Sequence, residues 1–209
     1  TVEETGLGIT QGDSDRVCRP IPGTLSKSPW YQKSMAQVLM TMHEADGNPF
    51  FADPRQVLKR INGQFQESGF TAVVAVELEF YLLDIRRDRQ KYPQPPMSPV
   101  TGKRDKNTQV YSVDDLDDYG EFLDQVVKGA ESQGIPADTA LAEYAPGQFE
   151  INLKHKPDPL SACDNAILLK RLVKGVAREM GIIATFMAKP YAQQAGRGTH
   201  IHISILNKN

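Results

Sequence analysis

The order of apolar and polar positions predicts strands that alternate with helices. Residues Phe70 to Asp84 form a mostly apolar run of strand-forming residues. Before it lies an apolar stripe at helical spacing, with Asp53 suited to the N-cap, Pro54 to the first helical position and Gly69 to the C-terminal end. The same reasoning predicts helices at 112–133 and 164–180, and strands at 16–19, 36–42, around 140–142 and 148–153, at 182–188 and around 200–205. These elements together predict a mixed α/β or α+β domain.

Two segments lack such a pattern. Residues 1–33 are rich in Gly, Pro, Ser and Asp and read as an extended connecting arm. Residues 86–106 are charged and rich in proline, which favours a mobile excursion over core structure.

Composition narrows the functional classes. The 209 residues are 40% apolar and 24% charged, as in a globular protein with one sizeable core and room for a small appendage. A net charge of −2 gives no reason to expect nucleic acid or a membrane surface as a partner. No apolar run reaches the length of a membrane span, so we expect a soluble cytoplasmic protein. Cys18 and Cys163 are far apart in sequence and read as free thiols.

Two glutamates interrupt the apolar strand at 70–84. Glu77 and Glu79 are two residues apart, so they point to the same face, while Val76, Leu78 and Phe80 point to the other. Two ionised carboxylates a few ångströms apart repel each other, and burying them is costly without a compensating cation. The alternatives are a bound metal ion or a solvent-facing strand that carries acids.

A second pair of glutamates lies in the predicted strand-loop-strand stretch. Glu143 and Glu150 are seven residues apart, which would place them on opposite faces of an unbroken strand. Pro146-Gly147 lies between them, and a turn or bulge there can restore a common face.

The last predicted strand carries two histidines. His200 and His202 share one face, and isoleucines occupy the other. Gly196 and Gly198 just before them would let the backbone approach a ligand closely. Ordinary strand histidines remain the alternative to metal ligands.

Two other charged clusters have simpler explanations. The aspartates at 114, 115, 117 and 118 lie where a helix dipole favours negative charge, which explains them better than metal binding does. The cations at 170, 171, 174 and 178 are typical of a solvated helix face.

Together, four glutamates and one or two histidines can converge in one pocket. Carboxylate-rich sets suit Mg²⁺ or Mn²⁺, and this many carboxylates favours two or three ions. Paired divalent ions beside a glycine-rich turn are typical of phosphoryl transfer. The sequence contains neither a Walker-type phosphate loop nor a dinucleotide-binding fingerprint.

Three segments in this order resemble the metal-site signatures of the glutamine synthetase family. They are Val-Glu-Leu-Glu-Phe-Tyr at 76–81, Glu-Tyr-Ala-Pro-Gly-Gln-Phe-Glu-Ile at 143–151 and Gly-Arg-Gly-Thr-His-Ile-His-Ile-Ser at 196–204. The segments at 19–25 and 164–175 look closer to the γ-glutamylpolyamine (γ-glutamylputrescine) synthetase branch than to ammonia-using glutamine synthetases.

The resemblance implies a division of metal ligands. Glu79, Glu143 and Glu150 would hold the ion nearer the glutamate substrate. Glu77 and His200 would hold the ion nearer the nucleotide phosphates.

The resemblance also implies substrate contacts. His202 would contact the ATP phosphates and the transferring group, and Gly196 would lie against bound glutamate. Ala195 departs from the asparagine common before that glycine, and Arg197 and Thr199 depart from the usual Ser and Met. None of these changes removes an implied metal ligand.

The implied fold is α+β, with the antiparallel sheet and packed helices of a glutamine synthetase catalytic domain. Residues 1–33 would end an N-terminal β-grasp domain and its connecting arm, and residues 34–209 would form the first part of the catalytic domain. The family's remaining metal glutamate, phosphate-binding arginines and flap glutamate would lie beyond residue 209, so we expect the isolated stretch to be inactive. The family's stacked rings imply a homo-oligomeric parent.

The implied reaction joins the γ-carboxyl of glutamate to an amine through γ-glutamyl phosphate, with ATP as the phosphoryl donor. A polyamine such as putrescine is favoured, and ammonia is the other acceptor. A metal- or nucleotide-binding scaffold without activity and a metal-dependent hydrolase are the alternatives.

Overall fold

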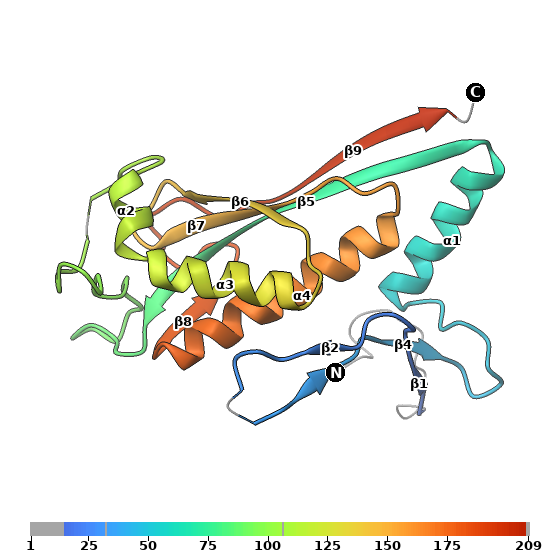
Figure 1. The fold of residues 1–209 in the computed structure, drawn as a ribbon, viewed down its shortest axis with the longest axis horizontal. Helices are drawn as coiled ribbons and strands as arrows, with labels where there is room; N and C mark the ends of the chain where they lie inside the picture. Colours follow the sequence, from blue (N-terminus) through green and yellow to red (C-terminus); the bar gives the residue numbers. More distant parts are fainter. Residues whose placement is uncertain (1–14, 32, 106, 208–209) are drawn as a thin grey trace.

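One long strand forms the centre of the fold. The computed structural model describes residues 15–31, 33–105 and 107–207. Strand β5 (Phe70–Asp84) lies within a five-stranded sheet with the order β6-β7-β5-β8, and β9 also pairs with β5 (Figure 1). The other strands are β6 (Ala137–Ala142), β7 (Gln148–Leu153), β8 (Ile182–Thr185) and β9 (Thr199–Asn207). All of these pairs are antiparallel, which confirms the expected α+β class.

The length of β5 allows two strands to share one of its edges. Strand β9 pairs with residues 70–78, and β8 pairs with residues 81–84. Strand β7 pairs with residues 77–81 at the opposite edge. Glu77 is therefore flanked by strands on both sides, whereas Glu79 pairs with β7 alone and lies at the gap between β9 and β8 on the other edge.

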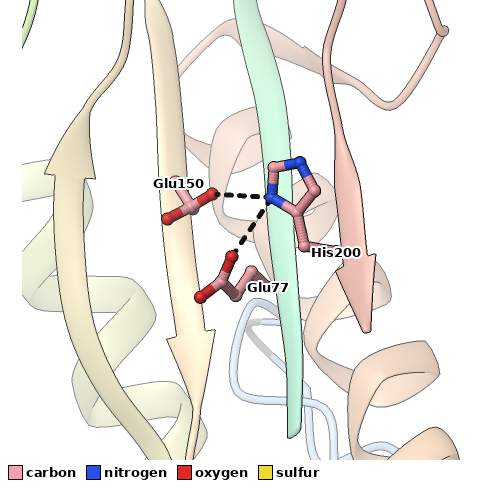
Figure 2. Close-up of side chains that lie close together, drawn as sticks. All are labelled: Glu77, Glu150 and His200. Atoms are coloured by element: carbon pink, nitrogen blue, oxygen red, sulfur yellow. Dashed lines mark hydrogen bonds and ion pairs between the residues drawn. The ribbon is translucent and has the colours of Figure 1, made fainter. Parts of the chain in front are cut away.

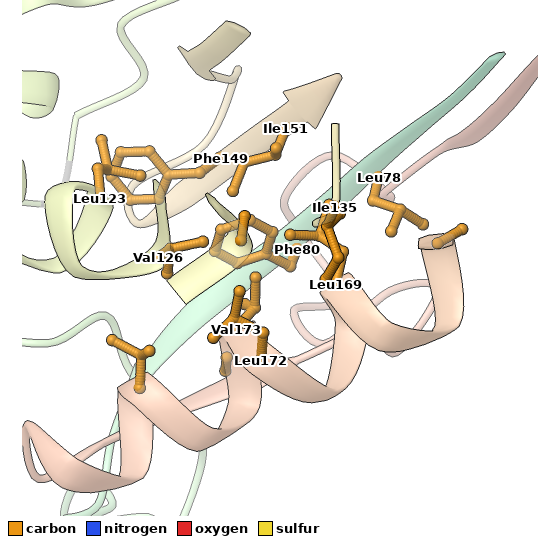
Figure 3. Close-up of a cluster of buried hydrophobic side chains, with 14 of the residues drawn as sticks. Leu78, Phe80, Leu123, Val126, Ile135, Phe149, Ile151, Leu169, Leu172 and Val173 are labelled. Atoms are coloured by element: carbon orange, nitrogen blue, oxygen red, sulfur yellow. The ribbon is translucent and has the colours of Figure 1, made fainter. Parts of the chain in front are cut away.

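The hydrophobic core lies between one face of this sheet and two helices, α3 (Gly120–Ser132) and α4 (Pro159–Glu179) (Figure 3). Phe80 and Leu82 of β5 are fully buried there, beside Leu169 and Leu172 of α4. Because strand side chains alternate, this packing directs the glutamates of β5 to the opposite face. On β9, Ile201, Ile203 and Ile205 are exposed.

Two helices begin with the same signal. Helix α1 (Pro54–Glu67) begins after Asp53, whose side chain accepts hydrogen bonds from the backbone N–H groups of Arg55 and Gln56, as predicted. Helix α4 begins at Pro159, with Asp158 as its N-cap, so the predicted start at residue 164 is wrong. The Asp-Pro pair at 158–159 repeats the pair at 53–54, and it was overlooked.

The single helix predicted at 112–133 is also wrong. Ser112 caps α2 (Val113–Asp118), and Tyr119 separates it from α3. The Tyr119 ring is buried, with its centroid 5.3 Å from that of Phe149, so tertiary packing replaces one continuous helix. Only the first two aspartates of the cluster, at 114 and 115, therefore lie in a first turn.

The N-terminal part forms two small sheets. Strand β1 (Val17–Pro20) pairs with β4 (Met40–His43), and β2 (Ser26–Lys27) pairs with β3 (Ala36–Gln37). The predicted strand at 36–42 is thus two strands, because the Leu39 N–H donates to Thr24 Oγ1 instead of continuing a ladder. The strand predicted at 16–19 lies one residue later. The boundary between residues 33 and 34 stays a prediction, and residues 1–14 lie outside the described range.

The segment at 86–106 has no helix and no strand among its described residues, as predicted, yet it is attached to the core. Arg104 Nη2 lies 2.7 Å from Asp84 Oδ2, and Tyr119 Oη donates to the Pro96 carbonyl at 3.3 Å. Pro96 and Ser98 are buried, so the expectation of an excursion outside the core is wrong for these residues.

Strand β8 ends at Thr185 rather than at 188. Arg197 explains the early end, because its Nε donates to the Phe186 carbonyl and its backbone N–H to the Ala188 carbonyl. Within residues 15–31, 33–105 and 107–207, no helix is both long and apolar enough to cross a membrane.

Candidate metal centre

The carboxylates lie on the sheet face that the helices leave uncovered. Glu79 pairs with Glu150 across β5 and β7, and both residues are only 6% exposed. Glu77 lies two residues before Glu79 and keeps 26% of its side chain exposed. The predicted common face of Glu77 and Glu79 is confirmed, and β7 adds a third carboxylate to it.

His200 is the point on which these carboxylates converge. Its Nδ1 lies 3.1 Å from Glu77 Oε2 and 3.9 Å from both Glu79 Oε1 and Glu150 Oε2. Figure 2 shows Glu77 and Glu150 pointing to the His200 ring from neighbouring strands. One ligand atom each from Glu77, Glu150 and His200 lie within 4.8 Å of one another, a spacing that one ion can bridge. Within the described residues, Glu77, Glu150 and His200 form the group of His, Cys, Asp or Glu side chains whose ligand atoms lie this close together.

Glu143 lies beside this group but not within it. It follows β6 at the start of the hairpin loop that leads to β7, and its N–H donates to the Gln148 carbonyl. Gly147, which has a φ of +72°, forms part of that turn. The pKa of Glu143 is raised by burial and then by the charges of Glu79 and Glu150, so the turn does bring it into their electrostatic range.

The electrostatics favour a cation. Burial, followed by the charges of Glu77 and Glu79, raises the pKa of Glu150, although Asn152 and His200 oppose that shift. A divalent ion would remove this repulsion. Carboxylate oxygens with one imidazole fit Mg²⁺ or Mn²⁺. The residues present therefore fit such a metal, while the division of the ligands between two ions stays a prediction.

His202 faces a hollow beside the carboxylates. Its Nε2 lies 2.9 Å from Glu77 Oε1, and its ring centroid lies 6.3 Å from that of His155. The hollow measures about 340 Å³, and Lys154 and Asn152 also line it. Sequence reasoning missed His155, although its position just past the strand that carries Glu150 was a usable signal.

Gln148 is a second residue that sequence reasoning missed. It is 2% exposed, and its Nε2 donates to Glu79 Oε2 at 2.9 Å and to the Gly196 carbonyl at 3.2 Å. Its Oε1 accepts from the Ala145 N–H at 3.1 Å. The available signal was a polar side chain two residues before Glu150 in the same predicted strand, and therefore on the same face.

The glycine-rich segment lies directly against the carboxylates. A Cβ on Gly198 would come within 2.6 Å of Glu79 Oε1 and 2.8 Å of the His200 ring. A Cβ on Gly196 would meet the Ala188 carbonyl at 3.2 Å. Tyr81 Oη donates to the Ala195 carbonyl at 2.6 Å, which holds the segment to β5. At Gly198 the backbone lies against Glu79 and His200, while its close approach to a ligand stays a prediction.

The other charged clusters stay apart from this centre. Helix α2 carries the aspartates, and none of them belongs to the group of close metal-capable side chains found in the described residues. On α4, Arg171, Lys174 and Arg178 are exposed, as expected for a solvated helix face. Lys170 is half-buried instead, with its Nζ 5.2 Å from the centroid of the Phe186 ring.

Comparison with known proteins identifies relatives of this chain. The family model "Glutamine synthetase, catalytic domain" matches residues 51–209. Gamma-glutamylputrescine synthetase PuuA of Escherichia coli (strain K12) is 50% identical over 206 residues, which cover 99% of this chain and 44% of that protein. Glutamate–isopropylamine ligase of a Pseudomonas species is 34% identical, over 96% of this chain and 43% of that protein.

Solved structures agree with the sequence comparison. The structure of GmaS in complex with ADP superposes with a TM-score of 0.80 at 27% identity, over 96% of this chain and 44% of that one. The chain thus spans less than half the length of the relatives it matches. Because the family model covers most of the chain and includes all five predicted metal ligands, the chain belongs to the glutamine synthetase family.

Proposed function

We propose that this chain forms part of an ATP-dependent ligase that joins the γ-carboxyl of glutamate to an amine through γ-glutamyl phosphate. The observation that carries the proposal is the convergence of Glu77, Glu79 and Glu150 on Nδ1 of His200, on the uncovered face of the sheet. Family membership supports the reaction class. Because the chain covers 44% of its 50% identical relative, the activity is proposed for the full-length natural protein.

The acceptor proposed first is a polyamine such as putrescine. The support is the 50% identity to gamma-glutamylputrescine synthetase, against 33% for the glutamine synthetase of Mycolicibacterium smegmatis. Ammonia is the second acceptor that the family allows, and it would give glutamine.

The glutamates and His200 would bind the metal ions. Glu77 and His200 would hold one divalent ion, and Glu79, Glu143 and Glu150 would hold another. Glu150 lies within 4.8 Å of the ligand atoms of Glu77 and His200, so the two ions would lie close together. When bound, two or three such ions would neutralise phosphate oxygens of ATP and of the transferring group.

His202 and the glycine segment would bind the substrates. His202 faces the hollow next to Glu77, a position suited to contacting the ATP phosphates during transfer. Gly196 would lie against the glutamate substrate, where a bare backbone permits close contact. Packing of substrate into this face would exclude water. Without that exclusion, water would hydrolyse the acyl phosphate before the amine could react with it.

The test is a coupled ligase assay on the full-length natural protein. We expect ADP and phosphate release that requires glutamate and Mg²⁺ or Mn²⁺, with γ-glutamylputrescine detected by mass spectrometry and less product from ammonia. ATP and metal binding without product would favour the scaffold alternative. A rate of ATP hydrolysis that does not depend on the amine, without ligated product, would favour a hydrolase.

Assembly and location belong to the same proposal. We propose a homo-oligomer of the ring type and a cytoplasmic location for the full-length protein. Light scattering after size-exclusion chromatography tests the assembly, and a monomeric active enzyme would contradict it.

A further inference from the structure

Gln148 joins two parts of the site that sequence order keeps far apart. Its amide group lies between Glu79 on β5 and Gly196 on the glycine segment. The orientation of the amide is determined by its surroundings, because the Ala145 N–H must face the oxygen and the two acceptors must face the nitrogen. Both Nε2 hydrogens are therefore used, one on each part.

The Gln148 amide also fixes the orientation of the Glu79 carboxylate. Gln148 engages Oε2, while Oε1 lies 3.9 Å from Nδ1 of His200. Rotation of the carboxylate would break the Gln148 bond. With the residue only 2% exposed, water has little access to replace that bond.

The glycine segment is fitted against the same carboxylate. The Cα of Gly198 lies so close to Glu79 Oε1 that an added Cβ would come within 2.6 Å of it. The Tyr81 hydroxyl donates to the neighbouring Ala195 carbonyl at 2.6 Å and so holds the segment to β5. A displacement of Glu79 must therefore move the segment or break a hydrogen bond.

We propose that Gln148 is a positioning residue that couples the Glu79 carboxylate to the segment 195–198, so that cation binding and the placement of Gly196 depend on each other. This inference rests on the proposed function. It adds to that function a reason for ordered binding, in which the metal fixes the surface that receives the amino acid. The coupling is reciprocal, as any linkage between two sites must be.

The test combines Mn²⁺ titration by electron paramagnetic resonance with amide hydrogen exchange at Arg197. The Arg197 N–H donates to the Ala188 carbonyl at 2.9 Å, so its exchange rate reports opening of the segment. In the wild-type chain, we expect saturating Mn²⁺ to slow this exchange roughly tenfold. In Gln148→Ala, we expect Mn²⁺ to bind roughly tenfold more weakly and no longer to slow the exchange.

Two further variants make the result specific. Gln148→Glu keeps the shape of the side chain but replaces the Nε2 donor with an oxygen, so the exchange response should be lost whatever the Mn²⁺ affinity becomes. Gln133→Ala removes a glutamine that donates to the Lys27 carbonyl, away from the sheet face, and should leave both readouts unchanged. Circular dichroism checks that each variant is folded.

The outcomes separate the inference from the proposed function. Wild-type protein that binds Mn²⁺ without a change at Arg197, or Gln148 variants that keep the full response, would overturn the coupling alone. Wild-type protein that binds no Mn²⁺ would overturn both the coupling and the proposed metal centre.

Discussion

Glu77 and His200 are direct cross-strand partners on β5 and β9, and His200 Nδ1 lies 3.1 Å from Glu77 Oε2. They are 123 residues apart in the sequence. Antiparallel pairing gives each residue one partner across the ladder, so this contact is a consequence of register. Glu77 and His200 are therefore held by the sheet rather than by a loop.

Removing either carboxylate of the β5 pair should weaken metal binding. We expect Glu77→Gln and Glu79→Gln each to weaken Mn²⁺ binding by roughly tenfold or more, since each loses a charged oxygen donor. Glu121→Gln, on the exposed surface of α3, is the matched control. Unchanged Mn²⁺ titrations for both variants would make Glu77 and Glu79 ordinary acids of a strand surface.

Gly198→Ala should disturb the site without removing a ligand. Its Cβ would press on Glu79 Oε1 and the His200 ring, so we expect about 1–3 kcal/mol of lost unfolding free energy and weaker Mn²⁺ binding. Gly63→Ala is the control, because its Cβ meets nothing within 4 Å and it lies inside α1, where alanine is favoured by about 1 kcal/mol. Denaturant unfolding and Mn²⁺ titration measure both. Wild-type behaviour of Gly198→Ala would mean that the backbone approach is not tight.

Asp53 should give the fold a measurable pH dependence. Burial opposes its ionisation, but hydrogen bonds from the N–H groups of Met42, Gln56 and Arg55 and from the Thr41 hydroxyl outweigh it, so its pKa is lowered from 3.8. A lowered acid pKa stabilises the folded state above the unfolded value, and that stabilisation is lost as the pH falls through the folded pKa.

The measurement compares wild-type protein with Asp53→Asn in urea. We expect the variant to be about 1–2 kcal/mol less stable near neutral pH, and the gap to narrow as the pH falls below 3.8. A gap that does not change with pH would show that the charge of Asp53 contributes nothing.

Gly175→Ala should expose the single tryptophan. Gly175 on α4 packs against the indole of Trp30, and an added Cβ would overlap that ring. Trp30 is 7% exposed, so its displacement should shift the fluorescence emission to longer wavelength and destabilise the protein by about 1–3 kcal/mol. Gly120→Ala, whose Cβ meets nothing within 4 Å, should leave the emission unchanged. An unchanged spectrum for Gly175→Ala would contradict the packing of the N-terminal arm on α4.

Local signals account for much of what the sequence predicted. The apolar run at 70–84 became β5 with the predicted bounds, and the Asp53-Pro54 signal located the start of α1. The break at Tyr119 was missed because it depends on the burial of its ring against β7, which no local signal contains. The start of α4 was missed although its signal was local.

The sequence by itself determined which residues share a face and which atoms they offer a metal, because side-chain period and ligand chemistry are local properties. Glu77 with Glu79, and His200 with His202, follow from alternation alone. Only the tertiary structure decided that Glu150 lies opposite Glu79, that His200 lies opposite Glu77, and that Gln148 joins Glu79 to Gly196. The register of β7 on β5 is selected by burying the apolar faces of both strands against α3 and α4, and that long-range energy cannot be read from spacing along one strand. The isoleucines of β9 are exposed, so its register on β5 is held by the backbone ladder between the two strands, which is equally absent from a single strand's spacing.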